Sequence, residues 1–188
     1  MPRLVQIIYI SRSTFTPKKI ANGIESNVAR ILAKSRANNR RDGLVGVLYF
    51  GSGFFFQCLQ GEEAAIDRLY GLLKADDRHK DVKLLSRTSI PALTYSDWAM
   101  KYALAEKEMP RLLQEGGYEA FDPYKFDDAM VEKVLRLLGA SKDPTSAMKA
   151  EELVSLAAQA PEAKSPKVWV LAGVVALVVI AAAFAFLR

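Results

Sequence analysis

The chain has 188 residues, a single cysteine and a net charge of +5. This length favours one compact domain with extensions over two full domains, and one cysteine excludes an internal disulfide. Basic and acidic residues are interleaved, and no aromatic-plus-basic signature of RNA recognition is present, so a nucleic acid is not an expected partner. The N-terminal run MPRLVQIIYISRS has too short an apolar stretch for a signal peptide, and we expect none.

The sequence begins with a predicted strand and a predicted helix. Residues 4–11, LVQIIYIS, form a short apolar run rich in β-branched residues, which is typical of a strand. Residues 25–39 are predicted to be helical, with Ser26 or Asn27 as the N-cap. The apolar residues that recur there at helical spacing are Ile24, Val28, Ile31 and Leu32.

A predicted β-hairpin follows, and its second strand contains an unusual polar residue. Residues 43–50 and 54–61 are predicted to be strands joined by the turn GSG at 51–53. The second strand, FFFQCLQG, carries Gln57 among phenylalanines, a cysteine and a leucine. A buried amide has N–H donors and an oxygen acceptor that each need a partner, so Gln57 is the first candidate for a functional residue.

The next elements complete the predicted fold. Residues 62–76 are expected to form a second helix, with acidic residues in its first turn, and residues 82–90 a further strand. One more strand is expected between Tyr95 and Leu104. The order βαββαββ predicts an α+β fold, a ferredoxin-like sandwich with two helices on one face of an antiparallel sheet.

The region that follows differs in composition from the predicted domain of residues 1–104. Residues 105–139 are expected to form a helical cap on that domain. Its two short helices are predicted at 105–116 and 127–139. Residues 140–166 are rich in Ala, Ser, Pro and Lys, and they are predicted to be a linker, with room for one amphipathic helix at 149–159.

The C-terminal residues are the most apolar part of the chain. Residues 168–187, VWVLAGVVALVVIAAAFAFL, contain neither a charge nor a proline. A helix of about twenty residues spans roughly 30 Å, the thickness of a bilayer core. Lys167 and Arg188 flank the segment, and Trp169 fits an interface position. We therefore expect residues 167–188 to be a membrane anchor, with the rest of the chain on the cytoplasmic side of a bacterial inner membrane.

Few residues in the chain are suited to catalysis. The single histidine, His79, lies in the polar run DDRHKD and is expected to be a solvated surface residue. Cys58 is next to Gln57 on a predicted strand and is expected to be a small core residue. No cluster has the spacing of metal ligands, and no glycine-rich phosphate loop is present. The sequence therefore favours binding over catalysis and predicts no metal site.

Residues 4–104 resemble the BLUF family, the blue-light sensors that use flavin. The segments that carry the resemblance occur in family order: LVQIIYISRS, SRANNRRDGLVGVLYF, FFFQCLQGEEAAIDRLY, ADDRHKDV and DWAM. The spacing from Asn39 through Gln57 to Met100 fits the family. The loop TFTPKKIANG contains an insertion relative to shorter members, and Gln60 stands where most members have glutamate.

The resemblance implies a flavin site and a role for each residue in it. Tyr9 would be the redox-active tyrosine and Gln57 the glutamine that switches. Trp98 and Met100 would be the pair on the last strand whose placement responds to light. The implied cofactor-binding residues are Tyr9, Ile31, Asn38, Asn39, Gln57, Leu73, Asp76 and Arg78.

Within that set, Ile31 and Leu73 would hold the flavin ring between the two helices. Asn39 would hydrogen-bond the carbonyl edge of the ring, with Asn38 nearby. Asp76 and Arg78 would lie near the polar edge of the flavin pocket. The implied cofactor is FAD, with FMN as the alternative. Its phosphates could meet the basic cluster, whose candidates are Lys34, Arg36, Arg40 and Arg41.

The resemblance also implies a mechanism. Excited flavin would take an electron from Tyr9, and a proton would follow through Gln57. When the charges recombine, Gln57 would be left rotated or tautomerised, the flavin absorption would shift to the red, and the dark state would return thermally. No output domain is recognised after the sensor, so the signal would pass to an unknown protein partner or through self-association into a homo-oligomer.

Two alternatives remain open at this level. The first is a ferredoxin-like binding or adaptor module, tethered to a membrane and without photochemistry. The second is an acylphosphatase-like enzyme that uses Asn38 or Asn39 with a nearby arginine on a phosphate. The loop TFTPKK, which lacks glycines, is a poor phosphate cradle and argues against the enzyme.

Overall fold

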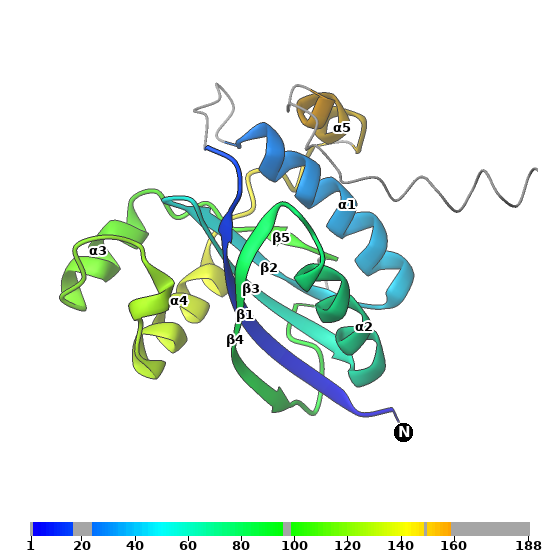
Figure 1. The fold of residues 1–188 in the computed structure, drawn as a ribbon, viewed down its shortest axis with the longest axis horizontal. Coiled ribbons are helices and arrows are strands. Elements are labelled where there is room, and N and C mark those ends of the chain that lie inside the picture. Colours follow the sequence, from blue (N-terminus) through cyan, green and yellow to red (C-terminus); the bar gives the residue numbers. More distant parts are fainter. Residues whose placement is uncertain (1, 17–23, 96–98, 149, 159–188) are drawn as a thin grey trace, which may run out of the picture.

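The computed structural model describes residues 2–16, 24–95, 99–148 and 150–158 (Figure 1). The sheet and the two helices that connect its strands are β1 (Leu4–Ser13), α1 (Ser26–Asp42), β2 (Val45–Gly51), β3 (Phe54–Glu62), α2 (Glu63–Lys74), β4 (His79–Ser89) and β5 (Lys101–Tyr102). The elements that follow are α3 (Glu108–Glu115), a 3-10 helix (Pro123–Lys125), α4 (Asp128–Ala140) and α5 (Ala150–Ala158). This order confirms the predicted βαββαββ sequence of elements.

The five strands form one mixed sheet in the order β4-β1-β3-β2-β5. All neighbouring strands are antiparallel except β5, which pairs parallel to β2. The expectation of a wholly antiparallel sheet is therefore wrong at this edge. Helices α1 and α2 cover one face, as predicted, and α3 and α4 lie on the other (Figure 1). The central strand is β3, flanked by β1 and β2, so its side chains lie at the middle of each face of the sheet.

Each face of the sheet has its own hydrophobic core, because side chains alternate between the two faces of a strand. The α1/α2 face buries Tyr9, Phe55 and Met100. The α3/α4 face buries Ile10 and Cys58. Cys58 is therefore the core residue that the sequence predicts, and burial raises the pKa of its thiol to about 12.

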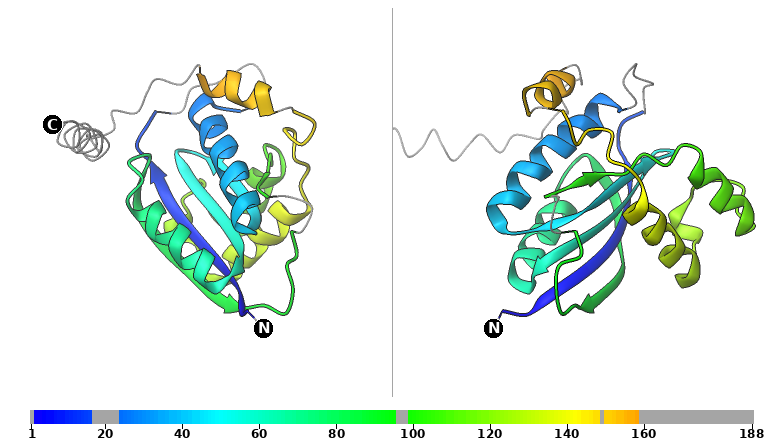
Figure 2. Two further views of the ribbon diagram at one scale, coloured as in Figure 1. Left: turned by 90° about the vertical axis from the view of Figure 1, so that its right-hand side faces the viewer. Right: turned by 180° about the vertical axis from the view of Figure 1, so that it is seen from behind.

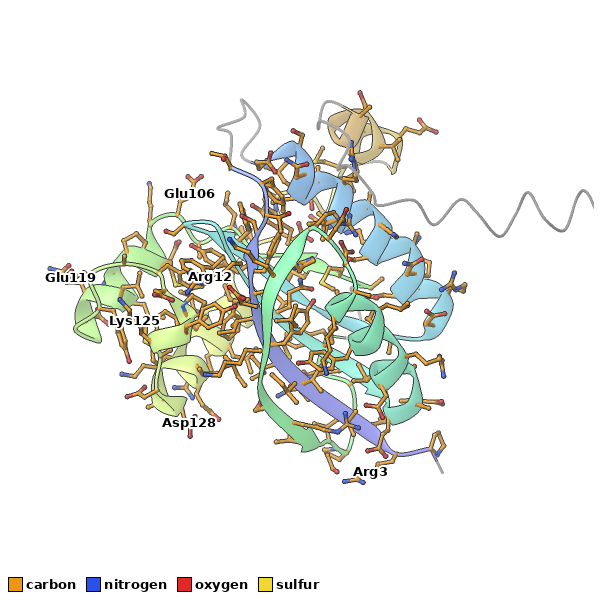
Figure 3. The ribbon with its side chains drawn as sticks, in the orientation of Figure 1. Arg3, Arg12, Glu106, Glu119, Lys125 and Asp128 are labelled. Atoms are coloured by element: carbon orange, nitrogen blue, oxygen red, sulfur yellow. The ribbon has the colours of Figure 1, made fainter. Side chains whose placement is uncertain are left out.

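The α3/α4 layer is held to the sheet partly through Arg12, near the end of β1. Figure 3 labels Arg12 between the sheet and this layer. Its guanidinium lies 4.9 Å from the ring centroid of Phe54 and 4.5 Å from that of Tyr124, and it pairs with Asp81 at 3.4 Å. An arginine placed over two aromatic rings gains cation–π attraction while its charge stays near solvent.

The turn between β2 and β3 consists of Ser52 and Gly53. Their φ angles are 51° and 79°, and two successive residues with positive φ make the tight turn that matches the twist of a hairpin. The predicted GSG turn is therefore confirmed. The hairpin register that follows places Gln57 opposite Leu48 of β2. On its other side β3 pairs with β1, where Gln57 lies opposite Tyr9.

The N-cap of α1 is Glu25, not Ser26 or Asn27 as expected. The Glu25 carboxylate accepts a hydrogen bond from the backbone N–H of Val28 at 3.1 Å and another from Asn27 Nδ2 at 3.0 Å. A carboxylate can reach the third backbone N–H of the helix as a serine does, and its charge also interacts favourably with the helix dipole.

The last strand is much shorter than the expected span from Tyr95 to Leu104. Among the described residues of that span, the strand consists of Lys101 and Tyr102, which pair with β2, and Ala99 and Met100 form a bend before it. Thr94 is instead held by a glutamine of β3: Gln60 Oε1 accepts from the Thr94 backbone N–H at 2.7 Å.

The segment beyond α4 was expected to be a linker, but Asp143 and Thr145 bond Arg36 of α1, and α5 packs against the same helix (Figure 2). Asp143 and Thr145 are buried, and α5 lies where the optional helix was predicted. The expected anchor, residues 167–188, lies outside the residues that the structure describes. Within the described ranges, no helix is long and apolar enough to cross a membrane.

Candidate functional site

Two buried polar side chains face each other at the centre of the sheet. Tyr9 and Gln57 are directly paired across β1 and β3, and they are 0% and 2% exposed. In the described part of the chain, Tyr9 Oη and Gln57 Nε2 are the only buried side-chain polar atoms that lack a hydrogen-bond partner. A buried unpaired polar group costs about 1–3 kcal/mol, so an orphaned pair on one face indicates a site for a polar ligand.

The surroundings of Tyr9 keep its phenol protonated. Burial is the main cause that raises the pKa of Tyr9 well above its usual value of 10. The negative charge of Asp76 and the neighbouring Tyr70 raise it further, and the Gln57 side chain acts in the opposite direction. The Tyr70 ring meets the Tyr9 ring edge-on, with 6.0 Å between centroids. Any loss of an electron from Tyr9 would therefore be coupled to loss of its proton.

The C-terminal end of α1 contributes Asn39, which is 1% exposed. Its Nδ2 donates a hydrogen bond to the Ala99 carbonyl oxygen at 2.7 Å. The next residue, Met100, is buried in the same core cluster as Tyr9. A single amide thus connects the helix to the bend before β5, directly before a residue of the core that contains Tyr9.

The loop between α2 and β4 contributes an ion pair. Arg78 Nε donates to Asp76 Oδ1 at 2.8 Å, and a second bond joins Arg78 Nη2 to Asp76 Oδ2. Burial acts to raise the pKa of Asp76, but the hydrogen bonds and charge of Arg78 outweigh it and lower the pKa to about 2. The pair is therefore ionised at neutral pH and acts on Tyr9 through the charge of Asp76.

His79 is buried, and the expectation of a solvated surface histidine is wrong. The residue is 6% exposed, its Nδ1 lies 2.8 Å from Ser11 Oγ, and its ring centroid is 4.5 Å from that of Phe55. Burial lowers the pKa of His79 to about 4, so the ring is neutral at pH 7. His79 is the first residue of β4 and is buried, although its neighbours in sequence are polar.

The two helices supply apolar side chains on either side of this polar set. Ile31 of α1 is 3% exposed, and Leu73 of α2 is half-buried and packs against the same cluster as Tyr9. Aliphatic walls with a few convergent polar groups suit a flat, largely apolar ring that has a polar edge. The residues present therefore fit a flavin ring.

Comparison with known sequences identifies the family. The sequence profile described as "BLUF: Sensors of blue-light using FAD" matches residues 4–101, which is more than half of the chain. The chain belongs to the BLUF family. Members of this family sense blue light with a flavin, and the BLUF domain is a sensor module, not an enzyme in itself.

Curated relatives are subunits of photoactivated adenylate cyclases. The beta subunit of Euglena gracilis is 32% identical over 98 residues, which is 52% of this chain and 11% of that protein. The alpha subunit is 29% identical over 99 residues, 53% of this chain and 9% of that protein. The BLUF chain thus spans about a tenth of the length of the curated relatives it matches.

Solved BLUF structures are similar over most of the described chain. The ground state of BlsA has a TM-score of 0.68 at 25% identity and covers 80% of this chain and 98% of its own. Its photo-activated state gives 0.65 at 26%, over 74% and 97%. The dark state of the BLUF protein BlrB gives 0.58 at 26%, over 74% and 98%.

Most of the implied BLUF site residues gather on the α1/α2 face of the sheet. The implied residues that are buried in that core or pack against it are Tyr9, Ile31, Leu73 and Met100, with Asn39 and Gln57 buried beside them. Asn38 is half-buried on α1 next to Asn39. Trp98 lies outside the residues that the structure describes, so its role stays a prediction.

The four residues of the basic cluster on α1 differ in their surroundings: Lys34, Arg36, Arg40 and Arg41. Arg36 turns inward, where its guanidinium pairs with Asp143 at 2.8 Å. Arg41 pairs with Asp42 at 2.8 Å. Lys34 and Arg40 are exposed and stay candidates for a phosphate.

Two contacts at the site were not foreseen. Tyr70 lies at helical spacing from Ile66 and Leu73, and this stripe could have placed it against Tyr9. The bond between Ser11 and the single histidine joins residues far apart in sequence, and no local pattern predicts it. Within the described residues, no group of three or more His, Cys, Asp or Glu side chains could hold a metal ion.

Proposed function

We propose that this chain is a blue-light photoreceptor that binds one flavin non-covalently between α1 and α2. The observation that carries the proposal is the pair of orphaned atoms, Tyr9 Oη and Gln57 Nε2, on the face that these helices cover. A flavin edge offers carbonyl and ring-nitrogen acceptors that an amide N–H could meet. We propose FAD, the cofactor in the family description, with FMN as the alternative.

The bound flavin would supply absorption of blue light and, once excited, the power to oxidise a neighbour. Tyr9 is the oxidisable group: it would give up one electron and its phenolic proton, and both would return, so no net redox change remains. Gln57 would relay the proton. Because the two ends of an amide have opposite hydrogen-bond character, a rotated or tautomerised Gln57 would keep different partners after the charges recombine.

The other implied residues would hold the ring and its edge. Ile31 and Leu73 would pack on its two faces, and Asn39, already bonded to Ala99, would present its remaining polar atom to the carbonyl edge. The Asp76–Arg78 pair would lie at the polar edge. For the phosphates we propose the exposed Lys34 and Arg40, since Arg36 and Arg41 have carboxylate partners.

The first experiment is to identify the cofactor. The full chain is expressed and purified, its visible spectrum is recorded, and the released small molecule is identified. We expect a yellow protein that holds about one FAD per chain. A colourless protein that takes up neither FAD nor FMN on reconstitution would contradict the proposal and favour the adaptor alternative. Hydrolysis of acyl phosphates by such a protein would favour the enzyme.

We further propose that residues 167–188 anchor the sensor at the inner face of a bacterial membrane and that the signal passes to a separate protein. The support is the sequence alone: an uncharged segment as long as a bilayer core, flanked by Lys167 and Arg188. Because several matched relatives are cyclase subunits, a membrane-bound effector of that kind is one class of partner to test.

A further inference from the structure

A row of paired residues leads from the Tyr9–Gln57 pair to the far edge of the sheet. Gln57 pairs with Leu48 of β2, and Leu48 pairs with Tyr102 of β5. The hydrophobic members of the row, Tyr9, Leu48 and Tyr102, belong to the core on the α1/α2 face. A change in the hydrogen-bond partners of Gln57 can therefore affect β5, two strands away, through side chains that are neighbours across the strands.

At the end of this row, a buried carboxylate holds β5. Asp143 Oδ2 accepts from the Tyr102 backbone N–H at 3.2 Å and from Arg36 Nη2 at 2.8 Å. Asp143 Oδ1 accepts from the backbone N–H and the hydroxyl of Thr145 at 2.9 and 2.7 Å. The Asp143 side chain is only 1% exposed, so the loss of any of these partners would leave a buried charge poorly paired.

Arg36 joins this carboxylate to the bend that carries Met100. Arg36 Nε donates to the Met100 carbonyl oxygen at 2.9 Å, and Nη2 also donates to Thr145 Oγ1 at 2.7 Å. One guanidinium, itself on α1, thus holds both the segment before β5 and the segment after α4. Its rigid planar fork makes the two sets of contacts interdependent.

Residues 139–145, which we call the connector, are also held from the opposite face of the sheet. Lys101 of β5 is 2% exposed, and its Nζ donates to the Gly139 carbonyl oxygen at 2.7 Å near the end of α4. Buried groups on both sides of β5 therefore fix residues 139–145, and any shift of β5 must be accommodated by these residues.

The connector leads to α5, which docks on α1 (Figure 2). Leu153 of α5 is 3% exposed and belongs to the core cluster that contains Val28 and Tyr9. The next residue, Val154, is 58% exposed. A helix of nine residues cannot hold its conformation or position by itself, so its place depends on this docking and on the connector.

We propose that α5 is the output element of this sensor: Arg36 and Asp143 form a latch that couples the position of Met100 to the docking of α5 on α1, and rearrangement of Gln57 weakens that docking. The inference rests on the proposed photochemistry. It assigns Arg36 a positioning role in place of the phosphate contact considered from the sequence. It also places the moving element directly before residues 159–188.

The test uses thiol labelling of the full, flavin-loaded chain. Cys58 is the only cysteine and is buried with a raised pKa, so wild-type protein is the blank. Leu153→Cys places a thiol in the docked interface, and Val154→Cys places one on the exposed side of the same helix. We expect Leu153→Cys to be labelled several-fold faster under blue light than in the dark, and Val154→Cys to be labelled at one rate in both.

Asp143→Asn, combined with Leu153→Cys, tests the latch. We expect labelling in the dark to rise on the order of tenfold and the effect of light to disappear, because the half-buried Arg36 guanidinium loses its counter-charge. Glu132→Gln removes the same charge from an exposed pair with Arg136 on α4 and should leave the light effect intact. Unchanged labelling in Asp143→Asn would overturn the role of the latch.

Absorption spectra of the same samples separate the two proposals. A red-shifted state that forms on illumination while Leu153→Cys is labelled equally in dark and light overturns the output role of α5 and leaves the photochemistry intact. Absence of any spectral shift overturns the proposed photochemistry, and with it light control of α5.

Discussion

Gln57 of the central strand β3 lies directly opposite Tyr9 of the neighbouring β1, and each side chain carries a buried polar atom with no hydrogen-bond partner. Elsewhere in the described chain, buried polar groups are well satisfied: Gln60, three residues along the same strand, bonds Gln6 and Thr94. The unsatisfied pair is thus a local exception, at the place where a BLUF cofactor would lie. Natural sequences break local rules of this kind mainly at functional sites.

Replacing Tyr9 by Phe should leave flavin binding intact and remove the stable red shift. The ring keeps its packing against Tyr70, but the group that gives up an electron and a proton is lost. The control is Tyr49→Phe. Tyr49 packs against the α3/α4 core, and burial raises the pKa of its phenol to about 12. A normal light-induced shift in Tyr9→Phe would contradict the mechanism.

Replacing Gln57 by Leu should abolish the red shift without destabilising the flavin-free protein. The change removes a buried N–H that has no partner, so the free energy of unfolding should stay within about 1 kcal/mol or rise. Gln60→Leu, on the opposite face of β3, should lower it by about 1–3 kcal/mol, because Gln6 and the Thr94 N–H lose their partners. Denaturant unfolding of both flavin-free variants measures the difference. A larger loss for Gln57→Leu would show that the amide is structurally paired.

Stability should fall as the pH drops from about 6.5 towards 4, because His79 is buried as the neutral ring. Its pKa in the folded chain is about 4, below the ordinary 6.5, so the unfolded state binds the proton first. The stabilisation is fully present above pH 6.5 and is lost as the pH falls through 4, on the order of 3 kcal/mol in all. Asp76, held at about 2, adds a further loss only below its ordinary 3.8.

Denaturant unfolding at a series of pH values checks this window. His79→Gln keeps a hydrogen-bonding group beside Ser11 and should flatten the dependence between pH 6.5 and 4. Since the chain has one histidine, its imidazole NMR signals can be assigned without ambiguity. An imidazole that titrates near 6.5 in the folded protein would refute the buried neutral ring.

Truncation after residue 140 should destabilise the sensor, whereas truncation after residue 158 should not. The shorter fragment lacks Asp143, so the half-buried guanidinium of Arg36 loses its partner, and it lacks Leu153 from the core over α1. Losing a buried leucine from a core costs about 2–5 kcal/mol. Thermal unfolding of the two flavin-loaded fragments provides the comparison, and equal stability would show that residues 141–158 are a linker after all.

Deleting residues 165–188 should release the protein from membranes and leave its photochemistry unchanged. The deleted part holds the uncharged segment, and the described BLUF site lies wholly before it. Fractionation of cells that express the full and shortened chains, followed by spectra of each, measures both effects. If the shortened chain still sediments with membranes, the C-terminal anchor is wrong.

The sequence predicted the elements of the central fold because their signals are local. Helical spacing around Val28 and the apolar run FFFQCLQG mark α1 and β3, and the glycine-containing turn fixes the hairpin register that places Gln57 opposite Leu48. The failures involve contacts distant in sequence. His79 looked solvated in its polar run because its partner, Ser11, is 68 residues away.

The C-terminal part of the BLUF chain was harder to predict for the same reason. The alanine- and serine-rich composition of residues 140–166 is typical of a linker. Asp143 is nevertheless buried, and it pairs with Arg36, which lies 107 residues earlier in the chain. Arg36 in turn looked like one of several phosphate ligands in a basic run. Only the tertiary structure shows that it is taken by Asp143 and the Met100 carbonyl.

The most direct test of the central claim is the absorption spectrum of the full, flavin-loaded chain in the dark, under blue light and during recovery. The account predicts a flavin spectrum that shifts slightly to the red, keeps its shape and returns in the dark, because Gln57 changes hydrogen-bond partners while the flavin regains its oxidation state. A spectrum that only bleaches, or does not change, would contradict it.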